Sequence, residues 1–507
     1  MTRPLFEGAA WSFETLRETY DAIERVALED LGLDPYPVRL EVITAEQMLD
    51  AYASTGMPVM YPHWSFGKRF AQHEMLYRKG MQTLALEIVL NSNPSLCYIM
   101  EENTMATQAV VIAHAAMGHT HFFKHNEVFR AWTEADMVLE ENRQAKIFVK
   151  DAEDRHGQPA VERVLDAAHA LFAHGVDPDR RTQRPDPAEA RARLAERRRE
   201  ERMQEDDLWR RTVPHPPEEE AEAESARAAD RRALSLPEEN LLYFLETFSP
   251  ALEDWQRELL RIVRRLASYF EPQRQTKLMN EGCATWTHYE IMQRLQQTGE
   301  IGEAAMLEFL QLHSSVIAQP RFDQKGYPGI NPYALGFAMM QDIARICTEP
   351  DDEDRDWFPD IAGNGDPHGT LRRAWAEFRD ESFIRQFLSP RLMRDWRLFS
   401  LRDTAGAPHL TIEAIHNEGG FRRVRSALAD QYDPAAHRPR IEVVDADLRG
   451  DRTLRLCHRV ELGQQLDPVE ARRVLRHVQR LWGYRVRLTE VDAEKDVELN
   501  AYEIPEE

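Results

Sequence analysis

Hydrophobic residues recur every three or four positions over most of the chain up to Asp395, and every second position after Trp396. The first spacing is that of an amphipathic helix, and the second is that of a half-buried strand. After Trp396 the predicted strands and helices follow the order ββαββαβ. We therefore predict an α+β fold, with a mainly α-helical N-terminal and central body that holds a short strand pair, and a small C-terminal α+β domain.

The helical spacing is clearest in four early segments, over residues 11–31, 44–55, 126–148 and 157–174. Two short apolar runs interrupt it, LALEIVLNSN and LCYIM, and Asn, Ser and Pro separate them. Those residue types favour turns, so the runs predict two short strands.

One segment differs sharply in composition from the rest. Residues 175–235 consist mostly of Arg, Glu, Asp, Ala and Pro and hold few apolar side chains. Such a segment buries too little apolar surface to offset its chain entropy, unless it forms an exposed helix. We therefore predict an N-terminal half (1–174), a charged linker or excursion (175–235), a central helical half (236–395) and a C-terminal domain (396–507).

Composition excludes several classes of protein. The 507 residues carry a formal net charge of -23, whereas a general nucleic-acid binder is basic. No run approaches eighteen apolar residues, so we expect no membrane span, and the N-terminus lacks the features of a secretory signal. These properties predict a cytoplasmic protein.

The cysteines are scattered along the chain, at Cys97, Cys283, Cys347 and Cys457. This spacing predicts reduced thiols rather than a zinc ribbon or a disulfide framework.

Candidate chemistry begins with a histidine-rich helix that follows the second apolar run and the turn Glu101–Thr104. It carries His114, His119, His121 and His125. At 100° per residue His119 lies well to the side of the other three, although a bend or bulge at the neighbouring glycine could return it toward His114. A strand, a turn and a histidine-bearing helix are typical of zinc proteins, but the glutamate of an H-E-x-x-H motif is missing.

A second stretch supplies a carboxylate and further imidazoles. Glu281, Thr285 and His288 share one helical face, and His313 lies on the next apolar helix. Glu281 and His288 are about 10.5 Å apart along the axis, which suits two ions, or one ion and a base. The candidate ligands for Zn²⁺, Mn²⁺ or Fe²⁺ are His114, His119, Glu281, His288 and His313. Glu102 and Glu281 are the candidate general bases.

Several blocks of sequence resemble the SpoVR family, which is named for a stage V sporulation protein needed for spore cortex formation. The blocks are HWSFGKRF (63–70), Tyr98 with the turn Glu102–Thr104, IAHAAMGHTHFFKHN (112–126), PEENLLYFLE (237–246), PQRQTKLMNEGCATWTHYEIM (272–292), NPYALGFAMMQDI (331–343) and DESFIRQFLSPRLMRD (380–395). Members also occur in bacteria that form no spores, beside genes for a serine protein kinase of the PrkA type. The resemblance implies a role in sporulation or stress physiology and supplies no catalytic mechanism.

Two functional hypotheses follow. In the first, the chain is a metal-dependent hydrolase, similar to a metallopeptidase, and the cortex connection implies a peptide or a peptidoglycan-related amide as substrate. In the second, it is a non-catalytic partner of a PrkA-type kinase, and its histidines are core groups that hydrogen-bond to backbone or carboxylates.

Overall fold

The computed structural model describes residues 3–54, 57, 60–78, 86–177, 234, 236–321, 324, 327–402, 411–414, 417–433, 438–448, 450–461 and 464–505. Most of the predicted charged segment, 178–233 and 235, lies outside these residues. The chain forms two compact units, which we describe separately. Unit 1 comprises Met1–Arg155 and Tyr269–His437, and unit 2 comprises His156–Ser268 and Arg438–Glu507. The predicted α+β fold is confirmed, whereas the predicted domain limits stay a prediction.

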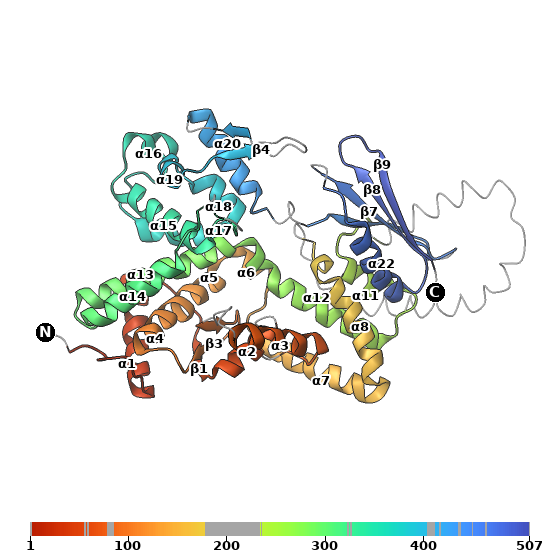
Figure 1. The fold of residues 1–507 in the computed structure, drawn as a ribbon, viewed down its shortest axis with the longest axis horizontal. Helices are drawn as coiled ribbons and strands as arrows, with labels where there is room; N and C mark the ends of the chain where they lie inside the picture. The colour runs from red at the N-terminus through yellow and green to blue at the C-terminus, as the bar shows by residue number, and fades with distance from the viewer. Residues whose placement is uncertain are drawn as a thin grey trace, which may run out of the picture. The chain divides into compact units, whose positions relative to one another are not determined.

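Unit 1 is mainly helical (Figure 1). Its helices are α1 (Phe13–Arg25), η1 (Val26–Asp30), α2 (Ala45–Ala53), α3 (Trp64–Arg78), α4 (Met105–Val111), η2 (Ile112–His119), α5 (Thr120–His125), α6 (Glu127–Trp132), α13 (Lys277–Gln297), α14 (Glu303–Val316), α15 (Pro332–Thr348), α16 (Asp352–Trp357), α17 (Pro367–Glu377), α18 (Asp380–Phe387), α19 (Pro390–Asp395) and α20 (Glu418–Asp430). Helices α7 (Val138–His156) and α12 (Asp254–Gln275) cross the limits of the two units along the chain.

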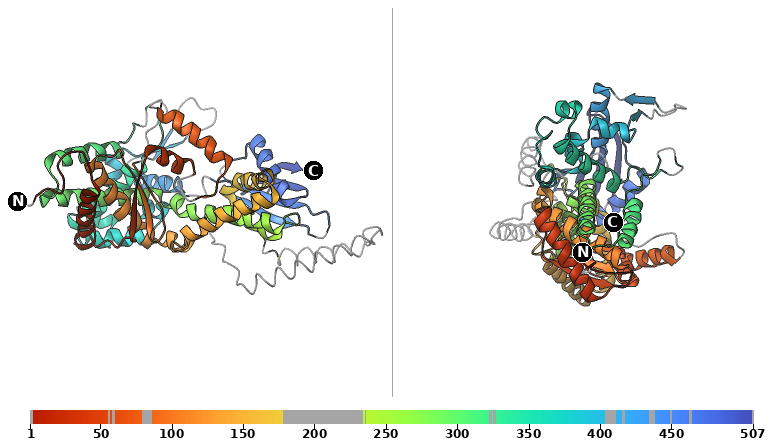
Figure 2. Two further views of the ribbon diagram at one scale, coloured as in Figure 1. Left: turned by 90° about the horizontal axis from the view of Figure 1, so that it is seen from below. Right: turned by 90° about the vertical axis from the view of Figure 1, so that its left-hand side faces the viewer.

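A three-stranded sheet lies beside these helices (Figure 2, left). Its strands are β1 (Val38–Ile43), β2 (Glu87–Val89) and β3 (Ser95–Met100). The central strand β3 pairs in parallel with β1 and antiparallel with β2. On one face of β3, Cys97 and Ile99 pack against Val111 and Ala115 of the histidine-bearing helix. The predicted strand pair is β2 and β3, and β1 adds a strand that the sequence pattern did not indicate.

Helix α13 is the hub of unit 1, because it contacts η2, α14, α15, α17 and α18. Its first turn is held by Asp380, whose two carboxylate oxygens accept hydrogen bonds from the backbone amides of Leu278 (2.8 Å) and Met279 (2.9 Å). These amides are among the donors that a helix leaves unsatisfied at its N-terminus. A buried side chain from α18 therefore fixes where α13 begins, and with it the positions of the residues that follow.

Glycine allows α15 to approach α13 closely. A Cβ atom on Gly282 would lie 2.7 Å from the carbonyl carbon of Gly336, and one on Gly336 would lie 2.4 Å from the carbonyl oxygen of Leu278. Real Cβ atoms do not come so near to backbone atoms, so neither position accepts a side chain without a shift of one helix. Gly282 of α13 and Gly336 of α15 therefore face each other where the two helices come closest.

A two-stranded sheet and a four-stranded sheet complete the described strands. In unit 1, β4 (Ser400–Arg402) pairs antiparallel with β5 (Thr411–Ala414). In unit 2 the order is β6 (Ile441–Ala446), β7 (Leu454–Val460), β8 (Val486–Asp492) and β9 (Glu498–Ile504). The predicted order ββαββαβ is present through β8, and β9 was not predicted. The helices of unit 2 are α8 (Gln158–Ala170), η3 (Phe172–His174), α11 (Leu241–Phe248) and α22 (Pro468–Trp482), and α22 packs on β8, β9 and α8.

Substitution Gly282→Ala tests the glycine contact. We expect the added methyl group to force α13 and α15 apart and to lower stability by about 1–3 kcal/mol, as overpacking usually does. The measurement is the thermal unfolding midpoint of the purified protein. Gly67→Ala is the matched control, because Gly67 lies in α3 and a Cβ there would meet nothing within 4 Å. That change should leave the midpoint unchanged or raise it slightly. Equal midpoints for the two variants would contradict the packing argument.

Candidate metal centre

His114 and His119 meet because the helix that carries them is not α-helical. Five positions in an α-helix would turn the two side chains about 140° apart. The segment η2 is instead a π-helix, whose i→i+5 bonding brings residues five positions apart over one another. The two rings lie edge to face, with centroids 4.6 Å apart. Departures of this kind occur often at functional sites, because they aim side chains in directions that regular helices do not.

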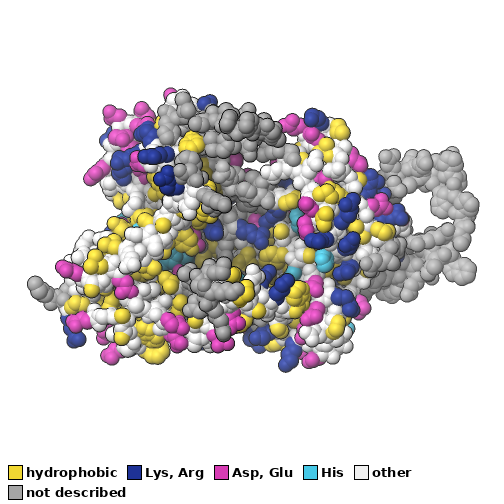
Figure 3. Space-filling model, viewed as in Figure 1, with side chains coloured by type: hydrophobic (Ala, Val, Ile, Leu, Met, Phe, Trp, Pro, Cys, Tyr) yellow, Lys and Arg dark blue, Asp and Glu magenta, His cyan; other side chains and the backbone are white. Residues whose placement is uncertain are grey.

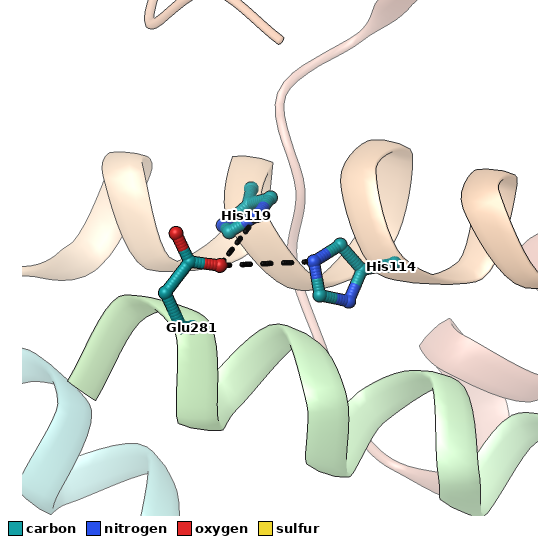
Figure 4. Close-up of side chains that lie close together, drawn as sticks. All are labelled: His114, His119 and Glu281. Carbon is teal, nitrogen blue, oxygen red and sulfur yellow. Dashed lines mark ion pairs between the residues drawn. The ribbon is translucent and has the colours of Figure 1, made fainter. Parts of the chain in front are cut away.

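The carboxylate of Glu281 comes from α13, which approaches η2 closely at a second glycine. A Cβ on Gly118 would lie 2.5 Å from Cα of Ala284. Because Gly118 and Ala284 have almost no side chain, the two helices can approach until Glu281 reaches both histidines. Figure 4 shows this carboxylate directed at the two rings from the facing helix.

The three side chains converge on a small volume. His119 Nε2 lies 3.6 Å and His114 Nε2 lies 3.9 Å from Glu281 Oε2. Among the residues that the structure describes, these form the one group of three or more His, Cys, Asp or Glu whose ligand atoms all lie within 4.8 Å of one another. Both histidines are 6% exposed.

Hydrogen bonds around the cluster leave one of its inner oxygens without a partner. His119 Nδ1 lies 2.9 Å from Oδ1 of Asn280, and this amide oxygen can only accept, so the ring hydrogen is on Nδ1. Nε2 of His119 therefore presents a lone pair toward Glu281. Oε2 of Glu281 is itself buried without a hydrogen-bond partner. Two acceptors face each other across 3.6 Å, an arrangement that repels unless a proton or a cation lies between them.

Two further residues belong to the site, although the sequence pattern did not single them out. Glu87, on β2, places Oε1 3.8 Å from His114 Nε2. Tyr333, near the start of α15, hydrogen-bonds to the Glu281 carboxyl and stacks on His114 at a centroid distance of 6.3 Å. Burial, together with the charges of Glu281 and Glu87, raises the pKa of the Tyr333 phenol, so it remains a hydrogen-bond donor at neutral pH.

Burial dominates the protonation of the site. It raises the pKa of Glu87 to about 8, and the negative charge of Glu281 adds to the effect. Burial also lowers the pKa of His114 and His288 well below the ordinary value, with neighbouring imidazoles contributing. His114 and His288 are therefore neutral, and the Glu87 carboxyl holds its proton at neutral pH.

The remaining sequence candidates lie at different distances from this cluster. His288 and His313 are buried behind it, where His288 Nδ1 lies 3.0 Å from His114 Nδ1, and His288 Nε2 lies 2.9 Å from His313 Nδ1. They contact the site through His114 and are not part of the three-residue group. Glu102 is exposed in the turn before α4, and it is not part of the group either.

The other two histidines of the stretch serve a different purpose. His121 Nδ1 accepts a hydrogen bond from the backbone amide of Asp34 at 3.0 Å, and His125 Nε2 lies 3.1 Å from the Asp34 carboxylate. They join α5 to the loop that precedes β1.

In the view of Figure 3, acidic and basic side chains are interspersed over the described surface. None of the described helices has the length and apolar character needed to cross a membrane.

Fold and site together define an α+β protein in which a strand–turn–helix unit and a second helix share a buried His–His–Glu cluster. The chain belongs to the SpoVR family. A family model described as SpoVR like protein matches residues 10–437, and one described as SpoVR-like C-terminal domain matches residues 439–493. A protein of Escherichia coli (strain K12), named uncharacterized protein YcgB, is 48% identical over 498 residues, which cover 98% of this chain and 96% of that protein. No solved structure matches the chain.

His121 predicts a pH dependence of stability that is separate from the cluster. Burial, with the nearby His125, lowers its pKa to about 3, against about 6.5 in an unfolded chain. Between these values the unfolded state binds the extra proton, so stability is lost as the pH falls, by up to about 1.4 kcal/mol per pH unit. Substitution His121→Gln keeps an acceptor for the Asp34 amide and removes the titration.

The measurement is urea unfolding at pH 6.5 and pH 4.5. We expect wild type to lose more stability between these two values than His121→Gln does. Equal losses in the two proteins would contradict the assignment of a neutral, buried His121.

Proposed function

We propose that this protein is a metal-dependent hydrolase that holds one divalent transition-metal ion between His114, His119 and Glu281. The observation that carries the proposal is the buried, unpartnered Oε2 of Glu281, which faces the lone pair of His119 Nε2 at 3.6 Å. An ion bound there by all three side chains would turn a repulsive contact into an attractive one.

The distances and the donor types fit such an ion. A tetrahedral zinc ion with ligands at 2.0–2.1 Å holds neighbouring donor atoms about 3.4 Å apart. The two distances from Glu281 Oε2, 3.6 and 3.9 Å, require only small side-chain movements to reach that value. Two imidazoles and one glutamate are a known set for catalytic zinc, and three protein ligands leave a position open. Manganese and iron accept the same donors.

Charge balance supports the same conclusion. Without an ion, Glu87 holds its proton at neutral pH, because burial and the charge of Glu281 raise its pKa to about 8. A divalent cation would lower that pKa and would balance the negative charges of both carboxylates. An apolar core that used these histidines only for packing would gain nothing from two carboxyl groups beside them.

The residues around the site suggest how hydrolysis would proceed. A bound metal ion supplies an acidified water and polarises a carbonyl group. Glu87, which lies beside His114 and outside the three-ligand group, would accept the proton from that water. Tyr333, which remains protonated, would orient Glu281 through its hydrogen bond. The open position and the base favour addition of water to an amide, so we propose a peptide or a peptidoglycan-related amide as the substrate class, in line with the family resemblance. The kinase partner stays a prediction.

Elemental analysis of the untagged protein tests the metal site. We expect about one equivalent of zinc, manganese or iron per chain in wild type, and a loss of most of it in His119→Ala, because one of three ligands is removed. His125→Ala is the matched control, since His125 lies on the adjoining helix α5 and pairs with Asp34 instead. A metal-free wild-type protein, or equal metal in the two variants, would contradict the proposal.

Substitution Glu87→Gln tests the proposed base. We expect the variant to keep its metal and to lose hydrolysis by a factor of about 10²–10⁴, the usual contribution of a general base. Wild type and variant are incubated with a random peptide mixture and with peptidoglycan stem peptides, and products that gain one water are counted by mass spectrometry. Glu102→Gln is the control, because Glu102 is exposed outside the cluster. Unchanged hydrolysis in Glu87→Gln would contradict the role of Glu87 as the general base.

A further inference from the structure

Three buried histidines form a continuous file that starts at the candidate ligand His114. Nδ1 of His114 lies 3.0 Å from Nδ1 of His288, and Nε2 of His288 lies 2.9 Å from Nδ1 of His313. The rings are 6%, 2% and 4% exposed, respectively. The file runs from η2 through α13 to α14, and η2 is far from the other two helices in the sequence.

Each hydrogen bond in the file uses one hydrogen, so the tautomer of one ring dictates that of the next. A ligand nitrogen must carry a lone pair, so a metal at His114 Nε2 requires the hydrogen on Nδ1. Nδ1 of His114 then donates to Nδ1 of His288, and Nε2 of His288 donates to Nδ1 of His313.

The surroundings of the file leave its nitrogens little alternative. His288 lies edge to face with Phe309 (5.8 Å between centroids), and His313 lies edge to face with Phe337 (4.9 Å). An aromatic ring is a much weaker hydrogen-bond partner than a nitrogen or oxygen atom. In this region each imidazole nitrogen of the file therefore pairs with the next imidazole.

We infer that His288 is a positioning residue for the metal ligand His114, and that His313 acts on the site through His288. The inference rests on the proposed function and extends it, because it assigns the file a role in fixing which nitrogen of His114 faces the ion. It requires neither residue to touch the metal. Partners of this kind contribute about 10–100-fold to metal affinity.

The test uses full-length, untagged protein that is stripped of metal and titrated with Co²⁺, and with Zn²⁺ in competition with a chromophoric chelator. We expect His288→Leu to weaken binding by about 10–100-fold and to change the visible absorption of bound Co²⁺. His288→Gln should restore most of the affinity, because its amide can accept from His114 and donate to His313. His313→Leu should weaken binding less, and should have no further effect in the His288→Leu background.

Unfolding of the metal-free variants is measured in parallel, so that loss of affinity is separated from loss of structure. If His288→Leu does not fold, the other two variants test the inference. We then expect near-normal metal binding in His288→Gln and weaker metal binding in His313→Leu. Two results overturn this inference and leave the proposed function standing. One is wild-type affinity and spectrum in His288→Leu, and the other is an equal loss of metal affinity from His313→Leu in the wild-type and His288→Leu backgrounds. A wild-type protein that binds neither ion removes the proposed function, and this inference with it.

Discussion

A buried carboxylate oxygen that faces two imidazole nitrogens is the constraint on which the rest of this structure depends. Oε2 of Glu281 lies within 4 Å of Nε2 of both His114 and His119 and has no hydrogen-bond partner. Burying a carboxylate oxygen without a hydrogen-bond partner costs free energy, so another interaction must offset that cost. In the proposed function, a bound cation would offset this cost directly and would also balance the carboxylate of Glu87 beside the site.

The helices around the cluster are arranged as that constraint requires. Gly118 and Ala284 let η2 and α13 approach, the π-helical turn aligns the two histidines, and Asp380 fixes the start of α13. Gly282 and Gly336 bring in α15, which carries Tyr333 to Glu281. One helix, α13, thus both packs unit 1 and positions the Glu281 carboxylate of the cluster.

The sequence alone indicated which residues form the cluster better than it indicated their geometry. His114, His119 and Glu281 stood out because imidazoles and a carboxylate on apolar helices are unusual. The direction of His119 could not be calculated, because the angular argument assumes 100° per residue and η2 is a π-helix. Glu87 was missed because one glutamate in a short strand has the pattern of an ordinary exposed strand position. Glu102, next to the histidine-rich helix in the sequence, is exposed in the turn, which sequence spacing does not reveal.

The same contrast holds for the fold. The change of hydrophobic period after Trp396 predicted the C-terminal strands and helices. Strand β9 was missed because ELNAYEI carries two glutamates and an asparagine, and its alternation changes phase between Ala501 and Tyr502.

The central claim is most directly tested by anomalous diffraction from crystals of the untagged protein, recorded on both sides of the absorption edge of the metal found. We predict one peak about 2.0–2.2 Å from His114 Nε2, His119 Nε2 and a Glu281 oxygen. A map with no peak there, and with Glu281 hydrogen-bonded to ordered water instead, would contradict it.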